Sequence, residues 1–251
     1  AAVRSNEEEP APSVVQHALR DVIGHCVYGV DLNPMAVELC KITLWMEAME
    51  PGKPLTFLDH HIQCGNSLLG CNSKLLAEGI PDEAFNPLTL DDRDVCSRFK
   101  RQNRDERRGV MEIFDADHSA WNDAASISAP SVELDRMADD TLESLTQKQK
   151  LFDDIQASER YQHRKLIMDA WCAAFAIRKS AASGLPYPIT QRVLDNLMES
   201  PHSIHPALRA EIIRLASEYR FLHWELAFPE VMIPPEQPSI GQTELRTVPA
   251  G

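Results

Sequence analysis

One short stretch decides the fold of this chain: Cys26-Val27-Tyr28-Gly29-Val30-Asp31-Leu32-Asn33-Pro34-Met35. Apolar and small residues run into an acid, and helix-start signals follow at once. Asn33 can cap a helix by accepting a bond from a backbone N–H group, and Pro34 suits a first helical position, where no N–H partner is needed. We therefore predict a buried strand at residues 26–30, with Asp31 at its carboxyl end and a helix after it.

Asp31 stands where ligands bind in open parallel sheets, outside the carboxyl ends of the strands. A carboxylate there can accept hydrogen bonds from both hydroxyls of an adenosine ribose. Asp31 is therefore the candidate ribose-binding acid. A strand that ends in Asp before a helix also occurs as an ordinary connection between two elements, with no role in ligand binding. This stretch alone does not decide between the two interpretations.

The composition is that of a globular protein large enough to bury a substantial core, with 251 residues, 43% of them hydrophobic and 25% charged. A formal net charge of −13 argues against a chain that coats nucleic acid by charge alone. The basic run at residues 100–108 includes two acids, and we expect it to form a solvated helix face with ion pairs. With no apolar run of membrane-spanning length and an acidic N-terminal segment, we expect a cytoplasmic protein that contacts no membrane.

Cysteine and histidine show no metal-binding spacing. The six cysteines include no Cys-x-x-Cys pair, and we expect reduced, structural thiols. Two histidine pairs remain, His60 with His61 and His202 with His205. For both pairs we expect a solvated or locally hydrogen-bonded role, so no metal site is predicted.

A second strand is predicted near residues 61–64, and the turn Gly65-Asn66-Ser67 follows it. The helix before it is expected to bury one face, because apolar residues recur at helical spacing at Met35, Leu39, Ile42, Met46 and Met49. A connection of this length suits a right-handed crossover between parallel strands. Asn66 and Ser67 should then lie beside Asp31 at the same edge of the sheet.

The rest of the chain changes character. Periodic charged and apolar residues predict helices at about 90–116, 131–179, 190–199 and 206–219. Alternating apolar and polar residues in the segment 221–232 predict a half-buried extended segment that returns to the sheet. The fold prediction is thus α/β, with a sheet of few parallel strands (residues 1–73), a large, mostly α-helical insertion (74–220), the return segment (221–232) and a proline-rich tail expected to be disordered (233–251).

Three stretches together resemble a known family: Val27 to Pro34, Cys64 to Gly70, and His223-Trp224-Glu225-Leu226-Ala227-Phe228-Pro229-Glu230-Val231. In this order they are similar to adenine-specific DNA methyltransferases of bacterial restriction–modification and phage-defence systems, of the type II-G and BREX kinds. The resemblance spans residues 13 to about 232, and within it the helical middle resembles the family only in its general character. It implies a Rossmann-like sheet that binds S-adenosylmethionine, and methylation of the exocyclic nitrogen of an adenine flipped out of DNA.

The resemblance also implies roles for individual residues. Asp31 looks like the acid that holds the cofactor ribose, with Leu32 near the adenine, and Asn66 and Ser67 match the turn that borders the adenine ring. The family's glycine-rich D-P-A-C-G-S-G motif and its catalytic N-P-P-[YFW] motif are both missing. No catalytic residue is assigned, and we expect an internal fragment of a longer methylase, inactive on its own.

Two other functions stay open. An NAD-type oxidoreductase shares the acid at the strand tip, but it needs a G-x-G-x-x-G turn that residues 20–24 do not supply. The helical residues 74–220 could instead form a noncatalytic module that positions DNA, with the basic run on phosphates. Preference for S-adenosylhomocysteine over NAD separates the first alternative from the methylase interpretation.

Overall fold

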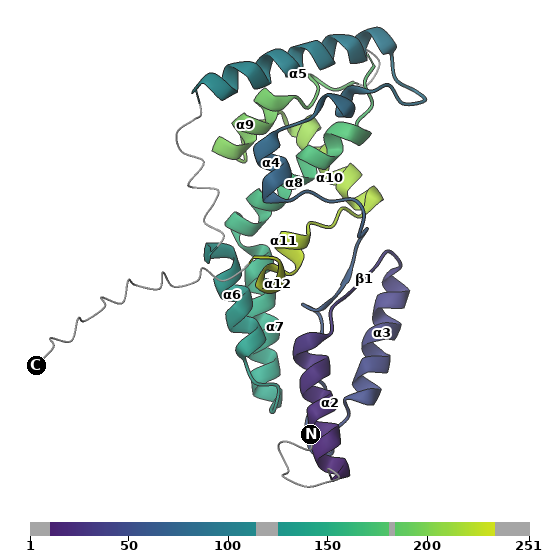
Figure 1. Ribbon diagram of the computed structural model, residues 1–251, viewed down its shortest axis with the longest axis vertical. Helices are drawn as coiled ribbons and strands as arrows, with labels where there is room; N and C mark the ends of the chain where they lie inside the picture. Colours follow the sequence, from purple (N-terminus) through teal and green to yellow (C-terminus); the bar gives the residue numbers. More distant parts are fainter. Residues whose placement is uncertain (1–10, 114–124, 181–183, 234–251) are drawn as a thin grey trace, which may run out of the picture.

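The computed structural model describes residues 11–113, 125–180 and 184–233, which form a mostly helical protein with one small parallel sheet. In chain order the elements are α2 (Pro12–Cys26), β1 (Gly29–Asp31), α3 (Pro34–Glu47), β2 (Ile62–Cys64), α4 (Ser73–Glu78), the 3-10 helix η1 (Asp82–Phe85), α5 (Arg93–Ile113), α6 (Ala125–Arg136), α7 (Leu142–Ala157), α8 (Glu159–Ala176), α9 (Gln191–Glu199), α10 (Pro206–Tyr219), α11 (Trp224–Ala227) and α12 (Pro229–Met232). Figure 1 shows an elongated molecule, with α2 and α3 at one end and α5 across the other. This agrees with the predicted sheet of few parallel strands and a large helical insertion.

The two strands run parallel, and their register pairs Gly29 with Ile62 and Asp31 with Cys64. The first strand begins later than predicted, because α2 continues to Cys26. The helix start beyond it is confirmed in detail. The Asn33 side chain accepts a hydrogen bond from the Met35 N–H group at 3.0 Å, and Pro34 lies in the first turn of α3.

Helix α3 follows as predicted, but the prediction of its buried face is wrong. Four apolar residues of α3 and Met49 just beyond its end, which together we call the α3 stripe, are 47 to 67% exposed: Met35, Leu39, Ile42, Met46 and Met49. The opposite side packs in a small core with α2 and the sheet through Val37, Leu44, Trp45 and Ala48. Because two opposite faces of α3 are apolar, spacing alone does not tell which face a two-stranded sheet covers.

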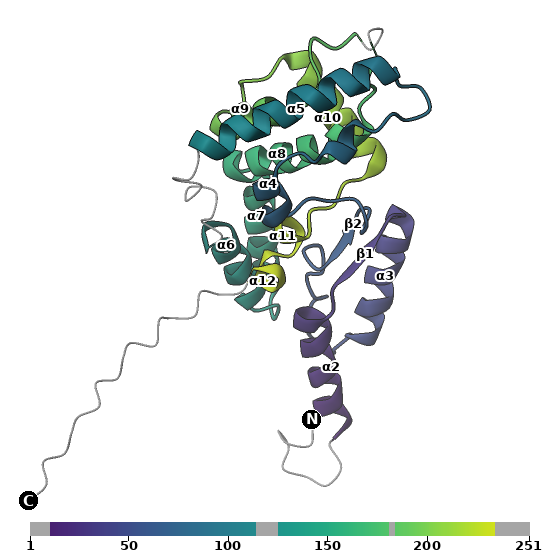
Figure 2. The ribbon, with the colours of Figure 1, turned by 45° about the horizontal axis from the view of Figure 1, so that its top comes forward.

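The helical insertion is built around α8, which is buried from Leu166 to Ala174 and packs against α7, α9, α10 and η1. Figure 2 shows α5 lying across this group. The periodic segment predicted at 131–179 is helical, but it is divided into three separate helices, α6, α7 and α8. Thr141 and Ser158 cap the starts of α7 and α8, accepting bonds from the N–H groups of Ser144 at 3.1 Å and Tyr161 at 3.3 Å. These local side-chain bonds break the periodic segment into three.

The return segment, predicted to be extended, is mostly helical, so this prediction is also wrong. Phe221 alone makes a strand-like contact, a parallel bridge with Asn66, and the Leu222 N–H group donates to the Leu69 carbonyl at 2.9 Å. The two short helices α11 and α12 follow. Pro229 begins α12, a position that needs no N–H partner.

Three further predictions can be checked against the described residues. The six cysteines are free, although only Cys71, Cys96 and Cys172 are buried. The basic run lies on α5, largely exposed, with an ion pair from Arg104 to Asp82. No helix in the described part of the chain is long and apolar enough to cross a membrane. Of the tail predicted to be disordered, only residue 233 lies within the described residues.

Candidate functional site

The structure brings the four sequence-predicted site residues together at one edge of the sheet. Asp31 and Leu32 lie at and after the end of β1, and Asn66 and Ser67 lie in the turn after β2. The Gly65 N–H group donates to the Asp31 carbonyl at 3.0 Å, which extends the strand pairing into that turn. We call these four residues the carboxyl edge. Their proximity follows from the parallel pairing, since both strands end on the same side.

Asp31 is exposed, and its carboxylate is only partly used within the protein. Its Oδ1 atom accepts a hydrogen bond from the Asn33 N–H group at 2.6 Å. Among the described residues no other hydrogen bond reaches this carboxylate. An ionised carboxylate can accept about four hydrogen bonds, so Asp31 can still bind hydroxyl groups of a ligand. The neighbouring Leu32 side chain is 54% exposed and offers an apolar surface.

The turn after β2 is held from two sides. The Asn66 side-chain oxygen accepts from the Leu68 N–H group at 3.1 Å, and the Asn66 N–H group donates to the Arg220 carbonyl at 2.7 Å. Trp224 donates from Nε1 to the Ser67 carbonyl at 3.2 Å. Side-chain bonds of this kind fix the turn, so Ser67 is presented at the edge on a rigid support.

Arg220 is a residue that the sequence analysis missed. Its guanidinium group donates to the Leu32 carbonyl and lies 3.4 Å from the Cys64 sulfur, so it joins the ends of the two strands. Its backbone adopts φ 52° and ψ 54°, the one left-handed non-glycine conformation among the described residues. Such conformations cost free energy and concentrate at functional sites. No local signal reveals this contact, because Arg220 is 188 residues from Leu32 in sequence.

Behind the turn, a close approach of two backbones locks the return segment in place. A Cβ atom added at Gly70 would lie 1.9 Å from the Leu222 carbonyl oxygen, so only glycine fits there. One residue further on, the Cys71 N–H group donates to His223 Nδ1 at 3.0 Å, and His223 Nε2 contacts Asp169 Oδ1 at 2.9 Å. This buried chain ties the turn, the return segment and α8 together.

The two histidine pairs differ from each other. His202 and His205 are exposed, and His205 Nδ1 accepts from the Ala207 N–H group at the start of α10, in line with the expected local role. His60 and His61 are buried, so the solvated role expected for them is wrong. No hydrogen bond reaches their ring nitrogens among the described residues, and Asp135 lies beside them. That acid is 75 residues from His60, and no sequence spacing connects the two.

The carboxyl edge therefore combines a partly free carboxylate, an exposed apolar side chain and a braced turn that ends at Ser67. Such a set suits a ligand with vicinal hydroxyl groups and a flat apolar ring. Comparison with known proteins gives no family: neither the protein-family models, nor the curated proteins, nor the solved structures include a match to this chain.

Proposed function

We propose that the carboxyl edge binds the adenosine part of S-adenosylmethionine, and that the chain belongs to an adenine-specific DNA methyltransferase with a Rossmann-like cofactor domain. One observation carries the proposal: the parallel register of β1 and β2 brings Asp31 to the same edge as the Asn66-Ser67 turn. The sequence resemblance supports the choice of cofactor and of DNA as substrate.

Each residue of the edge has a role in this proposal. Asp31 accepts hydrogen bonds from the ribose hydroxyls with the capacity that Asn33 leaves free. Leu32 packs against the adenine ring, and Arg220 keeps the Leu32 backbone in place through its carbonyl. Asn66 and Ser67 border the ring on the other strand end. The cofactor supplies an activated methyl group on sulfur, and these residues only hold and orient it.

Methyl transfer to adenine needs groups that this sequence lacks. The exocyclic amine of adenine is a weak nucleophile, because its lone pair is delocalised into the ring. The family's N-P-P-aromatic motif accepts the amine hydrogens and stacks the flipped base. No Asn-Pro-Pro occurs in the sequence, where Asn33 and Asn86 are each followed by a single proline. The proposal therefore predicts cofactor binding without methyl transfer by this chain alone.

Calorimetry with S-adenosylhomocysteine and, separately, with NAD tests the binding step. We expect S-adenosylhomocysteine to bind more tightly, and Asp31→Asn to weaken it at least about tenfold, since hydrogen bonds to a charged group contribute roughly 1.5–3 kcal/mol. Asp94→Asn is the matched control, an exposed acid on α5 that should leave binding unchanged. Tighter binding of NAD, or an unchanged affinity in Asp31→Asn, would refute the assignment.

A second measurement addresses the reaction itself. The chain is incubated with labelled S-adenosylmethionine and DNA, and we expect no label on DNA above background. Turnover by this chain would contradict the stated need for the missing motif. Salt-dependent DNA binding, without binding of S-adenosylhomocysteine or NAD, would favour the noncatalytic module instead. Alanine replacement of Lys100 and Arg101 should then reduce the salt dependence of DNA binding.

A further inference from the structure

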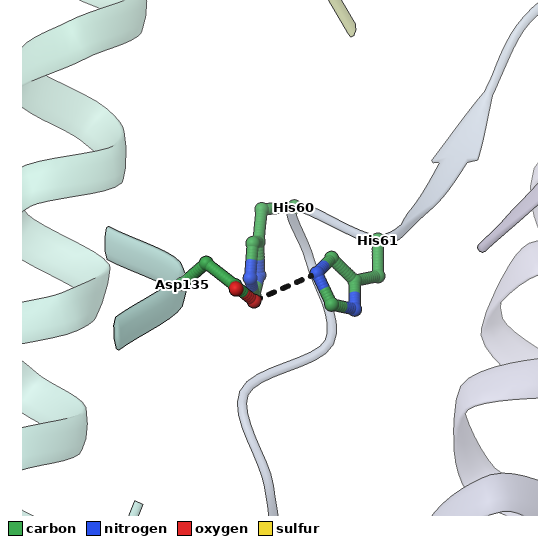
Figure 3. A group of neighbouring side chains, drawn as sticks. All are labelled: His60, His61 and Asp135. Carbon is green, nitrogen blue, oxygen red and sulfur yellow. Dashed lines mark ion pairs between the residues drawn. The ribbon is translucent and has the colours of Figure 1, made fainter. Parts of the chain in front are cut away.

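A buried polar cluster lies at the other end of the two strands, away from the carboxyl edge. His60 and His61 immediately precede β2, and Asp135 comes from the last turn of α6. Figure 3 shows the three side chains converging from these two elements. The two histidines are 5% and 0% exposed, and the Asp135 side chain is 27% exposed. The cluster thus joins the sheet to the helical insertion, with one side open to solvent through the acid.

The polar atoms of this cluster are poorly satisfied by the protein. None of the four ring nitrogens of His60 and His61 has a hydrogen-bond partner among the described residues, and neither has Asp135 Oδ1. His61 Nε2 lies 3.4 Å from Asp135 Oδ1, which is close enough for an ion pair but lacks hydrogen-bond geometry. Both ring nitrogens of His60 and the Nδ1 atom of His61 have neither a hydrogen bond nor an ion pair among the described residues. Buried polar groups are almost always partnered, so these three atoms call for an unseen partner.

The rings are held by their neighbours in a way that keeps them together. His60 stacks on Phe57 with ring centroids 5.3 Å apart, and its ring centroid is 3.9 Å from that of His61. The Tyr28 ring also contacts His61, with ring centroids 4.0 Å apart. The imidazoles therefore lie side by side in a fixed, aromatic-lined site, rather than as two mobile side chains.

We propose that His60, His61 and Asp135 bind a divalent transition-metal ion such as Zn²⁺. Two imidazole nitrogens and one carboxylate oxygen are a donor set that suits zinc or another late first-row metal, and they leave a coordination position for water. The ligand atoms lie within 4.8 Å of one another. In a tetrahedral zinc site they stand roughly 3.3 Å apart, so modest rotation of the side chains completes the site.

The ion would fasten α6 to the segment before β2. Since the three ligands come from parts of the chain 75 residues apart, the metal would act as a cross-link between the sheet and the helical insertion. This role is independent of the proposed cofactor site, which lies at the opposite ends of the strands.

The test uses the full chain after treatment with a chelator and titration with Co²⁺, whose visible absorption reports its ligands. We expect one equivalent to bind with a spectrum of nitrogen and oxygen ligands, and Zn²⁺ to displace it and raise the melting temperature. Asp135→Asn and His61→Ala should each weaken binding at least tenfold. The double variant His202→Ala/His205→Ala controls for surface histidines and should bind as the parent does.

Two measurements keep the result clear of folding defects and of the cysteines. In the parent protein, paramagnetic Co²⁺ should broaden the ring signals of His60 and His61 in NMR spectra and spare those of His202 and His205. Alkylation of the exposed Cys26, Cys40 and Cys64 should leave the Co²⁺ spectrum unchanged. A thiolate charge-transfer band that disappears on alkylation, broadening of His202 and His205 instead, or no binding at micromolar metal would each overturn the proposal.

Discussion

Replacing His223 with alanine should be among the most destabilising single changes in this protein. His223 and Asp169 are 4% and 3% exposed, and the imidazole lies between two buried polar groups. Its Nδ1 atom accepts from the Cys71 N–H group, which leaves the proton on Nε2 to be donated to Asp169. Removal of the ring leaves both groups without this partner, although Lys165 still pairs with Asp169 at 2.6 Å.

The expected loss follows from the two broken contacts. An unsatisfied buried N–H group costs about 1–3 kcal/mol, and a buried carboxylate that loses a partner costs more. We expect a total of roughly 3–5 kcal/mol, a large part of the 5–15 kcal/mol that stabilises a typical domain. In urea unfolding followed by circular dichroism, with a slope of about 3 kcal/mol per molar, the midpoint should fall by roughly 1–1.7 M.

Matched variants separate the two contacts. His223→Asn can keep the acceptor for Cys71 and His223→Gln can keep the donor for Asp169, so each should recover part of the loss. His202→Ala removes an exposed ring whose side chain makes no hydrogen bond to the described residues, and it should change stability by less than about 0.5 kcal/mol. The reasoning is refuted if His223→Ala unfolds at the same urea concentration as His202→Ala.

Three further outcomes are expected. Gly70→Ala should lower the free energy of unfolding by about 1–3 kcal/mol, and with it the melting temperature, because the added Cβ atom would overlap the Leu222 carbonyl. Asn103→Ala should destabilise by roughly 2–4 kcal/mol in urea, since the fully buried amide donates to one backbone carbonyl and accepts from one backbone N–H group. Stability should fall as pH rises from about 4.5 to 7, because folding raises the pKa of Glu230 to about 7 and so disfavours its charged form. Glu230→Gln should remove this pH-dependent part of the stability, which is roughly 1–2 kcal/mol after allowance for partial exposure to solvent.

Each of these has its own check. Leu68→Ala, in the same turn as Gly70 but 90% exposed, should leave the melting temperature nearly unchanged. Arg101→Ala, exposed on α5, serves the same purpose for Asn103. An equal pH dependence in the parent and in Glu230→Gln would show that Glu230 does not carry the effect.

Features encoded by neighbouring residues were predictable from the sequence. The end of β1, the Asn33 cap and the start of α3 lie within a few residues, and local backbone preferences decide them. The parallel pairing with β2 followed from the length of the connection. The same reasoning failed for α3, where both faces are apolar, and for 131–179, where the caps at Thr141 and Ser158 interrupt a pattern that reads as continuous.

Contacts between distant residues were beyond such reasoning. Arg220 reaches Leu32 across 188 residues, and His223 meets Asp169 across 54 residues, and nothing in local spacing marks either pair. The neighbourhood of His60, His61 and Asp135 has the same origin. The sequence alone gives no sign that the histidine pair is unusual, and only the packing of α6 beside the segment before β2 shows that the two rings are buried and that an acid joins them.

The α3 stripe gives the molecule an intrinsic chemical probe. Three of its residues, Met35, Met46 and Met49, are 64, 67 and 57% exposed, whereas Met168 in α8 is fully buried. Dilute peroxide converts accessible thioethers to sulfoxides, so the three stripe methionines should react early and Met168 late. Anything that covers α3 would slow oxidation at those three positions alone. Peptide mass spectrometry can therefore follow contacts on this face without a label or a substitution.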